Sequence, residues 1–143
     1  MFEAILAQIQ AYDTIILHRH YRPDGDALGS QIGLKHILRE NFPGKTVYTV
    51  GDDAGFFSFM EDSQMDQIPD SLYGGALAVI LDCGAAHLIS DDRWQLAEKT
   101  VRIDHHLFTG KFADEEVIDS SFESCCELTA TRTAPVAPVQ RAT

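Results

Sequence analysis

The sequence predicts an α/β fold, in which a mostly parallel sheet is flanked by helices. Short apolar runs alternate with segments whose apolar residues have helical spacing, which is the pattern of strand–helix–strand units. The runs are apolar without interruption, as strands are when both faces of their sheet are covered. Three of the runs also end in carboxylates or histidines, and an open parallel sheet gathers its functional groups at the carboxyl ends of its strands.

The first half of the chain contains two expected helices and a strand between them. Apolar residues recur on one helical face over residues 2–10, and the first strand follows at 14–18. Pro23 disfavours helix at the residue before it and therefore marks a loop. The next helix passes through Leu28 and is expected to stop at Pro43-Gly44.

The rest of the chain is expected to supply most of the sheet. Four further strands are predicted, at residues 46–50, 77–81, 101–103 and 116–118. A helix is expected over residues 91–98, and the aromatic segment 56–60 is expected to form a short helix or a plug.

The C-terminal part of the chain does not continue this pattern. Residues 1–128 are expected to form one domain, and residues 129–143 a disordered tail. Capping boxes at 120–123 and 124–127 each announce a helix. Beyond residue 128, however, two prolines and the lack of large apolar side chains leave that helix without a buried face. The domain is therefore expected to stop before its last helices.

Composition and charge exclude several classes of function. The chain has 22 acidic and 11 basic residues and a formal net charge of −11, which argues against binding long duplex nucleic acid through many phosphate contacts. A short phosphorylated substrate is compatible, because bound divalent cations reverse the local charge of an acidic cleft. No apolar stretch approaches the ~20 residues of a membrane span, and the N-terminus lacks a secretion signal. We therefore expect no membrane partner and a cytoplasmic location.

Five residues at the ends of three strands are candidate metal ligands: His20, Asp24, Asp26, Asp82 and His105. Taken singly, each has an ordinary explanation, such as a helix N-cap at Asp26, a turn at Asp82 or a surface histidine at His105. Turn chemistry does not explain why they occur together at successive strand ends, and the joint pattern indicates a metal-dependent hydrolase. Carboxylate and imidazole ligands suit Mn²⁺, Mg²⁺ or Fe²⁺ better than a thiolate-type zinc site.

Other polar residues have simpler interpretations. His18 is expected to be a packed or hydrogen-bonded strand residue. Asp52 and Asp53 are expected to be solvated loop charges. Adjacent residues at a strand end point in different directions, so His105 and His106 are not expected to bind the same ion.

The candidate ligands also resemble a known family. The motif H-x-x-P-D-G-D-A at residues 20–27, the strand-end Asp82 and the D-H-H at residues 104–106 resemble the signature of the DHH phosphoesterases. Within that family, residues 18–31 and 117–128 look most like the bacterial nanoRNase/pAp-phosphatase branch. The resemblance covers about residues 10–128.

The resemblance implies a hydrolase that uses two Mn²⁺ ions on short oligoribonucleotides and on 3′-phosphoadenosine 5′-phosphate. The family's ligand roles fall on His20 and Asp24 for one ion, Asp26 and His105 for the other, and Asp82 as the bridge. Asp104 would orient the site, and His106 would face the substrate phosphate. Asp82, Asp104 and His106 are thus the implied catalytic residues.

Family members continue with helices that carry one further metal-binding Asp, and then with a second domain, DHHA1, that holds the substrate. Nothing in this sequence matches these parts, so we expect the chain in this form to be weakly active or inactive. An uncovered apolar sheet face would also favour association into a homo-oligomer. The alternatives are an enzyme like the manganese inorganic pyrophosphatases, which resemble the chain at the same motifs, and a non-catalytic metal-binding remnant.

Overall fold

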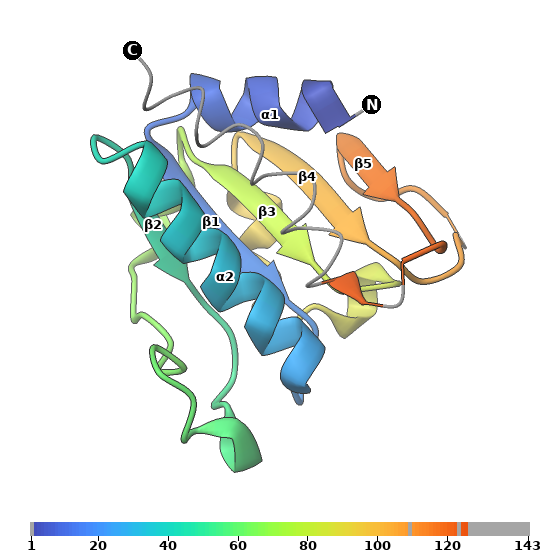
Figure 1. Cartoon of the computed structure of the whole chain (residues 1–143). Helices are drawn as coiled ribbons and strands as arrows, with labels where there is room; N and C mark the ends of the chain where they lie inside the picture. The colour runs from blue at the N-terminus through green and yellow to red at the C-terminus, as the bar shows by residue number, and fades with distance from the viewer. Residues whose placement is uncertain (1, 109, 123, 126–143) are drawn as a thin grey trace.

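A sheet of five parallel strands forms the framework of the molecule (Figure 1). The strands are β1 (Thr14–Arg19), β2 (Thr46–Thr49), β3 (Leu77–Leu81), β4 (Lys99–Asp104) and β5 (Glu115–Ile118). The structure is a computed structural model, and it describes residues 2–108, 110–122 and 124–125. The predicted α/β class is confirmed, and each predicted strand is present with small differences at its ends.

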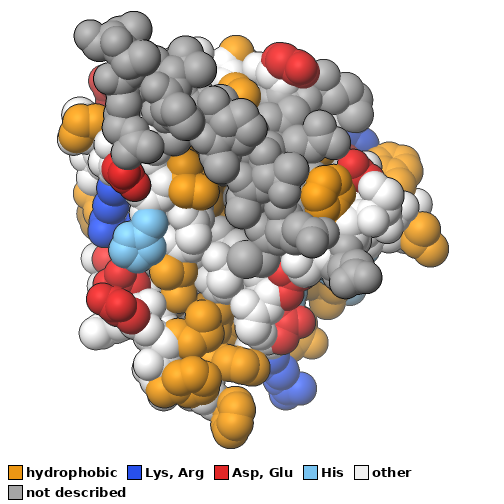
Figure 2. Space-filling model, in the orientation of Figure 1, with side chains coloured by type: hydrophobic (Ala, Val, Ile, Leu, Met, Phe, Trp, Pro, Cys, Tyr) orange, Lys and Arg blue, Asp and Glu red, His pale blue; other side chains and the backbone are white. Residues whose placement is uncertain are grey.

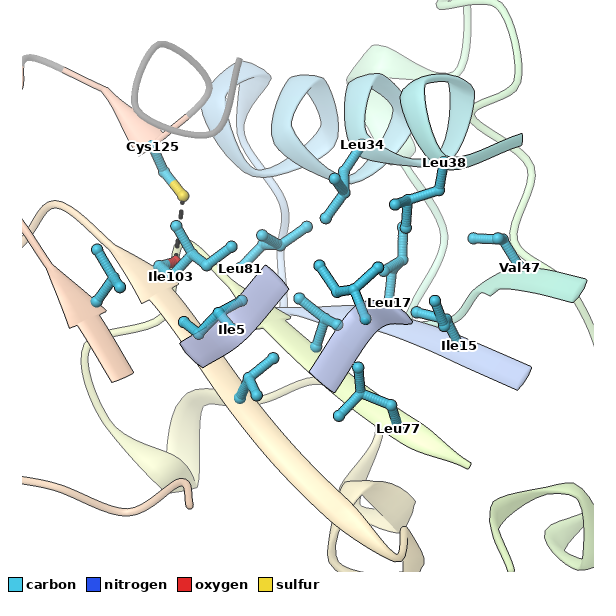
Figure 3. Close-up of a cluster of buried hydrophobic side chains, with 14 residues drawn as sticks. Ile5, Ile15, Leu17, Leu34, Leu38, Val47, Leu77, Leu81, Ile103 and Cys125 are labelled. Atoms are coloured by element: carbon cyan, nitrogen blue, oxygen red, sulfur yellow. Dashed lines mark hydrogen bonds between the residues drawn. The ribbon is translucent and has the colours of Figure 1, made fainter. Parts of the chain in front are cut away.

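Two helices cover one face of the sheet, α1 (Phe2–Ala11) and α2 (Gly25–Asn41). Their apolar faces pack against the strands in the largest buried cluster, which is drawn in Figure 3. Only alternate strand residues take part, because successive side chains of a strand point to opposite faces of the sheet. Its members include Ile5, Ile9, Ile15, Leu17, Leu34, Leu38, Leu77, Leu81 and Ile103. Both predicted helices are confirmed. No helix in the described part of the chain is long and apolar enough to cross a membrane.

Short 3-10 turns cover the opposite face of the sheet, namely η2 (Asp70–Tyr73), η3 (Ala86–Leu88) and η4 (Asp92–Leu96). The helix expected over residues 91–98 is thus only a 3-10 turn. The Asp91 carboxylate accepts hydrogen bonds from both the backbone and the guanidinium of Arg93. Such local side-chain bonds compete with helical hydrogen bonding and favour a short turn.

The aromatic segment 56–60 is not a plug. It contains a single 3-10 turn, η1 (Gly55–Phe57), and the side chains of Phe56 and Phe59 are 85% and 76% exposed. Only Phe57 and Met60 pack partly against a small apolar cluster near the start of α2. Figure 2 shows hydrophobic side chains gathered at the lower end of this view, where η1 lies in Figure 1.

The strand order β2-β1-β3-β4-β5 creates a switch point between β1 and β3. The chain leaves β1 for β2 on one side, then returns past β1 to build the rest of the sheet on the other side. Ligands of open α/β sheets bind outside the carboxyl ends of strands at such a point. Arg19 pairs with Leu81 and Leu81 with Ile103, so β1, β3 and β4 end side by side.

The C-terminal predictions fall largely outside the described residues. Ser120 and Ser121 lie in a turn, and the second capping box begins at Ser124 and continues into residues that are not described. The prediction for residues 129–143 concerns that same part of the chain.

His18 is buried within the sheet, as expected of a packed strand residue. Its Nε2 lies 3.0 Å from the hydroxyl oxygen of Tyr73, at hydrogen-bonding distance. Burial in an apolar environment lowers the pKa of His18 to about 4, although the Asp91 carboxylate acts in the opposite direction.

We expect His18 to make the fold sensitive to acid. In the unfolded chain a histidine binds its proton near pH 6.5, whereas folded His18 resists protonation down to about pH 4. Stability should therefore fall as the pH drops between these values, by up to about 1.4 kcal/mol per pH unit. His18→Gln should remove this part of the pH dependence, as measured by urea unfolding. The matched control is His87→Gln at an exposed histidine; an H18Q protein as acid-sensitive as the wild type would contradict the assignment.

Candidate metal centre

Asp82 lies at the centre of the site. It directly follows β3, all of whose residues are buried, and is itself only 2% exposed. Its φ of 54° is in the left-handed region, and its backbone N–H donates to the carbonyl of Ile103 on β4, 3.1 Å away. Burial raises the pKa of Asp82, and the hydrogen bond with His20 opposes that rise only in part.

One group of possible metal donors combines Asp82 with the loop after β1. His20 Nε2 lies 3.5 Å from Asp82 Oδ2 and 3.6 Å from Asp24 Oδ1. The other ring nitrogen of His20, Nδ1, lies 2.8 Å from the Tyr21 carbonyl oxygen, which accepts a hydrogen bond from it. This contact leaves Nε2 facing the carboxylates. The hydrogen bond with Asp82 raises the pKa of His20 to about 9, against the effect of burial.

A second group joins Asp82 to the end of β4. His106 Nδ1 is 2.6 Å from Asp104 Oδ1 and 3.9 Å from Asp82 Oδ1. His105 Nε2 is 3.3 Å from Asp82 Oδ1 and 3.1 Å from Asp26 Oδ2. Asp26 thus faces His105. The structure brings all seven predicted site residues together at one edge of the sheet.

His105 and His106 do not point in different directions, contrary to the expectation. Their ring centroids are 4.6 Å apart, with 36° between the ring planes. β4 ends at Asp104, so both histidines lie in the following coil, where the alternation of strand side chains no longer applies. Their partners distinguish them, because His106 is held by Asp104 whereas His105 faces Asp26 and Asp82.

Asp24, not Asp26, is the N-cap of α2. Asp24 has an extended backbone, and its Oδ1 accepts a hydrogen bond from the backbone N–H of Ala27 at 2.8 Å. Asp26 lies in the first turn of the helix, where its Oδ2 accepts from the backbone N–H of Cys125 at 2.9 Å. The ordinary explanation considered for Asp26, helix capping, therefore applies to Asp24 instead.

These residues fit a divalent cation. Asp82 Oδ1 is buried and makes no hydrogen bond within the described part of the chain. Asp82 also belongs to both donor groups, within each of which the ligand atoms lie no more than 4.8 Å apart. A cation would satisfy this oxygen, and carboxylate and imidazole donors suit Mn²⁺, Fe²⁺ or Mg²⁺.

Arg19, at the end of β1, holds the first loop of the site and was not singled out from the sequence. It is fully buried, and its Nη1 lies 2.6 Å from Asp52 Oδ1 and 3.3 Å from the His20 carbonyl. Burial alone would raise the pKa of Asp52, but hydrogen bonds from Ser90, Arg22 and Arg19 hold it below its usual value. Asp52 is an exposed loop residue, as expected, but its carboxylate is also the partner of a buried guanidinium.

Arg102, on β4, fixes the loop after the two histidines. It is 1% exposed, and its Nε and Nη2 donate to the two carboxylate oxygens of Glu116 at 3.0 and 2.8 Å. The same guanidinium donates to the carbonyls of Cys83 and Gly110, both at 3.1 Å, and lies 4.3 Å from the ring centroid of Phe112. A basic residue inside an apolar run makes Arg102 unusual in the sequence, although it does not identify the partner; Arg19, which lies between two histidines, gives no such signal.

Comparisons with known proteins agree with this architecture. The model of the DHH family, N-terminal domain, matches residues 14–139, a range that extends past residue 128, where the resemblance seen in the sequence ends. The probable bifunctional oligoribonuclease and PAP phosphatase NrnA of Streptococcus mutans is 42% identical over 127 residues, which cover 89% of this chain and 40% of the relative. The bifunctional oligoribonuclease and PAP phosphatase NrnA of Bacillus subtilis is 40% identical over 124 residues, or 87% and 39%. The chain therefore spans about two fifths of the length of these relatives.

A solved structure shares the fold. The crystal structure of an exopolyphosphatase-related protein from Bacteroides fragilis superposes with a TM-score of 0.79 at 24% sequence identity. The match covers 93% of this chain and 42% of that one.

We expect divalent metal binding to release about one proton from His20 at neutral pH. The pKa of His20 is raised to about 9 in the metal-free protein, so the ring is protonated near pH 7 and must lose a proton to act as a ligand. Apparent Mn²⁺ affinity should rise about tenfold per pH unit from pH 7 to pH 8. Calorimetry in buffers of different ionisation enthalpy measures the release. His20→Asn should abolish it, and a wild-type protein that releases no proton would contradict the role of His20.

His105 and His106 should differ in their effect on bound metal. His105→Ala should weaken Mn²⁺ binding by roughly tenfold or more, because its Nε2 faces two carboxylates. His106→Ala should keep the metal and lose turnover, because its Nδ1 is engaged by Asp104. Metal content after dialysis and hydrolysis rates separate the two effects. Identical metal losses in the two variants would remove the distinction.

Proposed function

The chain belongs to the DHH family, and on that premise we propose that it provides the metal centre of a two-metal phosphoester hydrolase. The proposed substrates are short oligoribonucleotides and 3′-phosphoadenosine 5′-phosphate, and the proposed metal is Mn²⁺. The relatives from S. mutans and B. subtilis are named as oligoribonucleases and PAP phosphatases, and these names support this substrate class. The observation that carries the proposal is that a single buried carboxylate, Asp82, is shared by two groups of metal donors.

The two oxygens of Asp82 face different donor groups. Oδ2 faces His20 at 3.5 Å, and Oδ1 faces His105 at 3.3 Å. This is the arrangement expected of a carboxylate that bridges two ions, with His20 and Asp24 on one side and His105 and Asp26 on the other. Ions held there would supply Lewis-acid charge to the phosphate and acidify the attacking water.

We propose that His106 binds the substrate phosphate. The buried Asp104 carboxylate accepts a hydrogen bond from His106 Nδ1 and keeps the ring in one orientation. Nε2 is then left for the substrate. Asp104 thereby positions the His106 ring.

Replacing Asp82 should abolish activity. In a full-length protein that carries this domain, Asp82→Ala should lower Mn²⁺-dependent hydrolysis of a diribonucleotide by at least roughly 100-fold, because both donor groups lose their shared member. The control is Asp92→Ala, at an exposed aspartate of η4, which should retain activity. Equal rates in the two variants would refute the bridging role.

The same assay separates the proposal from its rivals. An enzyme like the manganese pyrophosphatases would hydrolyse pyrophosphate faster than a diribonucleotide. A non-catalytic metal-binding remnant would bind Mn²⁺ and hydrolyse neither. We expect the diribonucleotide and 3′-phosphoadenosine 5′-phosphate to be hydrolysed faster than pyrophosphate, and either rival pattern would overturn the proposal.

A further inference from the structure

A cavity of about 560 Å³ lies directly beside the metal centre. Two of its lining residues, His20 and Asp82, are proposed metal ligands, and a third, His106, is the residue proposed to bind the phosphate. Its size is within the range of sites that bind small organic ligands. Any ligand whose phosphate reaches the donors can therefore place its remaining atoms in this cavity.

The wall away from the donors is apolar. Its large side chains are Tyr21, Leu88 and Leu107. They come from the loops after β1, β3 and β4, which are the loops that carry the metal donors. Tyr21 is 45% exposed and Leu107 is 79% exposed, so a ligand could still bury much of their surface.

Backbone contacts fix two sides of this wall relative to each other. The Tyr21 N–H donates to the Leu88 carbonyl at 2.9 Å, and the Ser90 N–H donates to the Arg19 carbonyl at 3.0 Å. The wall is thus formed before a ligand binds, which lowers the entropic cost of binding.

Among the described residues that line the cavity, Arg22 is the one Lys or Arg. Its guanidinium carbon lies 5.7 Å from the ring centroid of Tyr21. Its backbone has a φ of 54°, and its N–H donates to Asp52 Oδ2 at 2.9 Å. An aromatic ring beside a cation, next to a phosphate-binding centre, is complementary to a planar base joined to an anion.

We propose that this cavity binds the nucleoside next to the phosphate at the metal centre, with its base stacked on Tyr21 and packed against Leu88 and Leu107. Arg22 faces a phosphate of the same nucleotide. This inference rests on the proposed function, because the metal centre sets the position of the phosphate. Leu88 and Leu107 carry no hydrogen-bonding side-chain groups, so the base is held at this wall by packing and by stacking on Tyr21.

Calorimetric titrations of the chain with adenosine 5′-monophosphate and ribose 5-phosphate, in excess Mg²⁺, test the base site. The monophosphate should bind at least roughly tenfold more tightly, because base stacking on an aromatic ring adds that much affinity. Tyr21→Ala should remove this difference, and Tyr21→Phe should keep it. Phe56→Ala, at an aromatic residue of η1 that does not line the cavity, is the matched control and should also keep it.

Two results would overturn the inference: equal binding of the two ligands by the wild type, or an unchanged difference in Tyr21→Ala. A preference of more than about 100-fold for one of the four nucleoside monophosphates would overturn recognition by stacking alone. Failure of the proposed function has a different signature. Adenosine would then bind as tightly as its monophosphate and remain dependent on Tyr21, which would support the base site while removing the phosphate site.

Discussion

Asp82 is a carboxylate held out of water at the end of a strand that is buried along its whole length, and the site is arranged around it. Burying a charge costs several kcal/mol unless it is well paired. Here the partners are the imidazoles of His20 and His105, at 3.5 and 3.3 Å, and Oδ1 makes no hydrogen bond with any described residue. Such pairing stabilises the fold poorly but favours cation binding, because a bound cation offsets the free-energy cost of burying the Asp82 carboxylate. This explains why the end of β3 is a binding site and not an extension of the core.

The donors keep their positions without a metal because two buried arginines hold the loops. Arg19 pairs with Asp52, and Arg102 with Glu116, on the strands either side of β3. Without its carboxylate partner each arginine would be a buried, uncompensated charge, so each pair strongly favours a single arrangement of its loop, although the Asp52 side chain itself is 40% exposed. The direct ligands are thereby supported by a surrounding layer of hydrogen bonds, as accurate metal sites require.

The sequence predicted the strands and the convergence of the site residues because both follow from local patterns and from the geometry of parallel sheets. It could not predict which arginines are buried, because Arg19 meets its partner 33 residues away and Arg102 meets its partner 14 residues away. Asp24 and Asp26 flank the same glycine and look equivalent in the sequence. The backbone N–H of Cys125, 99 residues beyond Asp26, bonds to Asp26, while Asp24 caps the helix. The Cys125 contact and the two arginine pairs are tertiary, and no local pattern encodes them, whereas the Asp24 cap is a local contact with Ala27.

The charge of the site makes metal and nucleotide binding interdependent. Four carboxylates converge there in a chain of net charge −11, and Arg22 is the one Lys or Arg of the adjoining cavity in the described part of the chain. Without cations these carboxylates repel a phosphate, and with cations the local charge is reversed. Linkage then requires a nucleotide to raise the affinity for the cations by the same factor. The wall formed by Tyr21, Leu88 and Leu107 is uncharged, so its contribution to binding does not depend on the metal. Pyrophosphate has no apolar part that could use this wall, so the wall is the feature that separates a nucleotide from pyrophosphate at an otherwise similar centre.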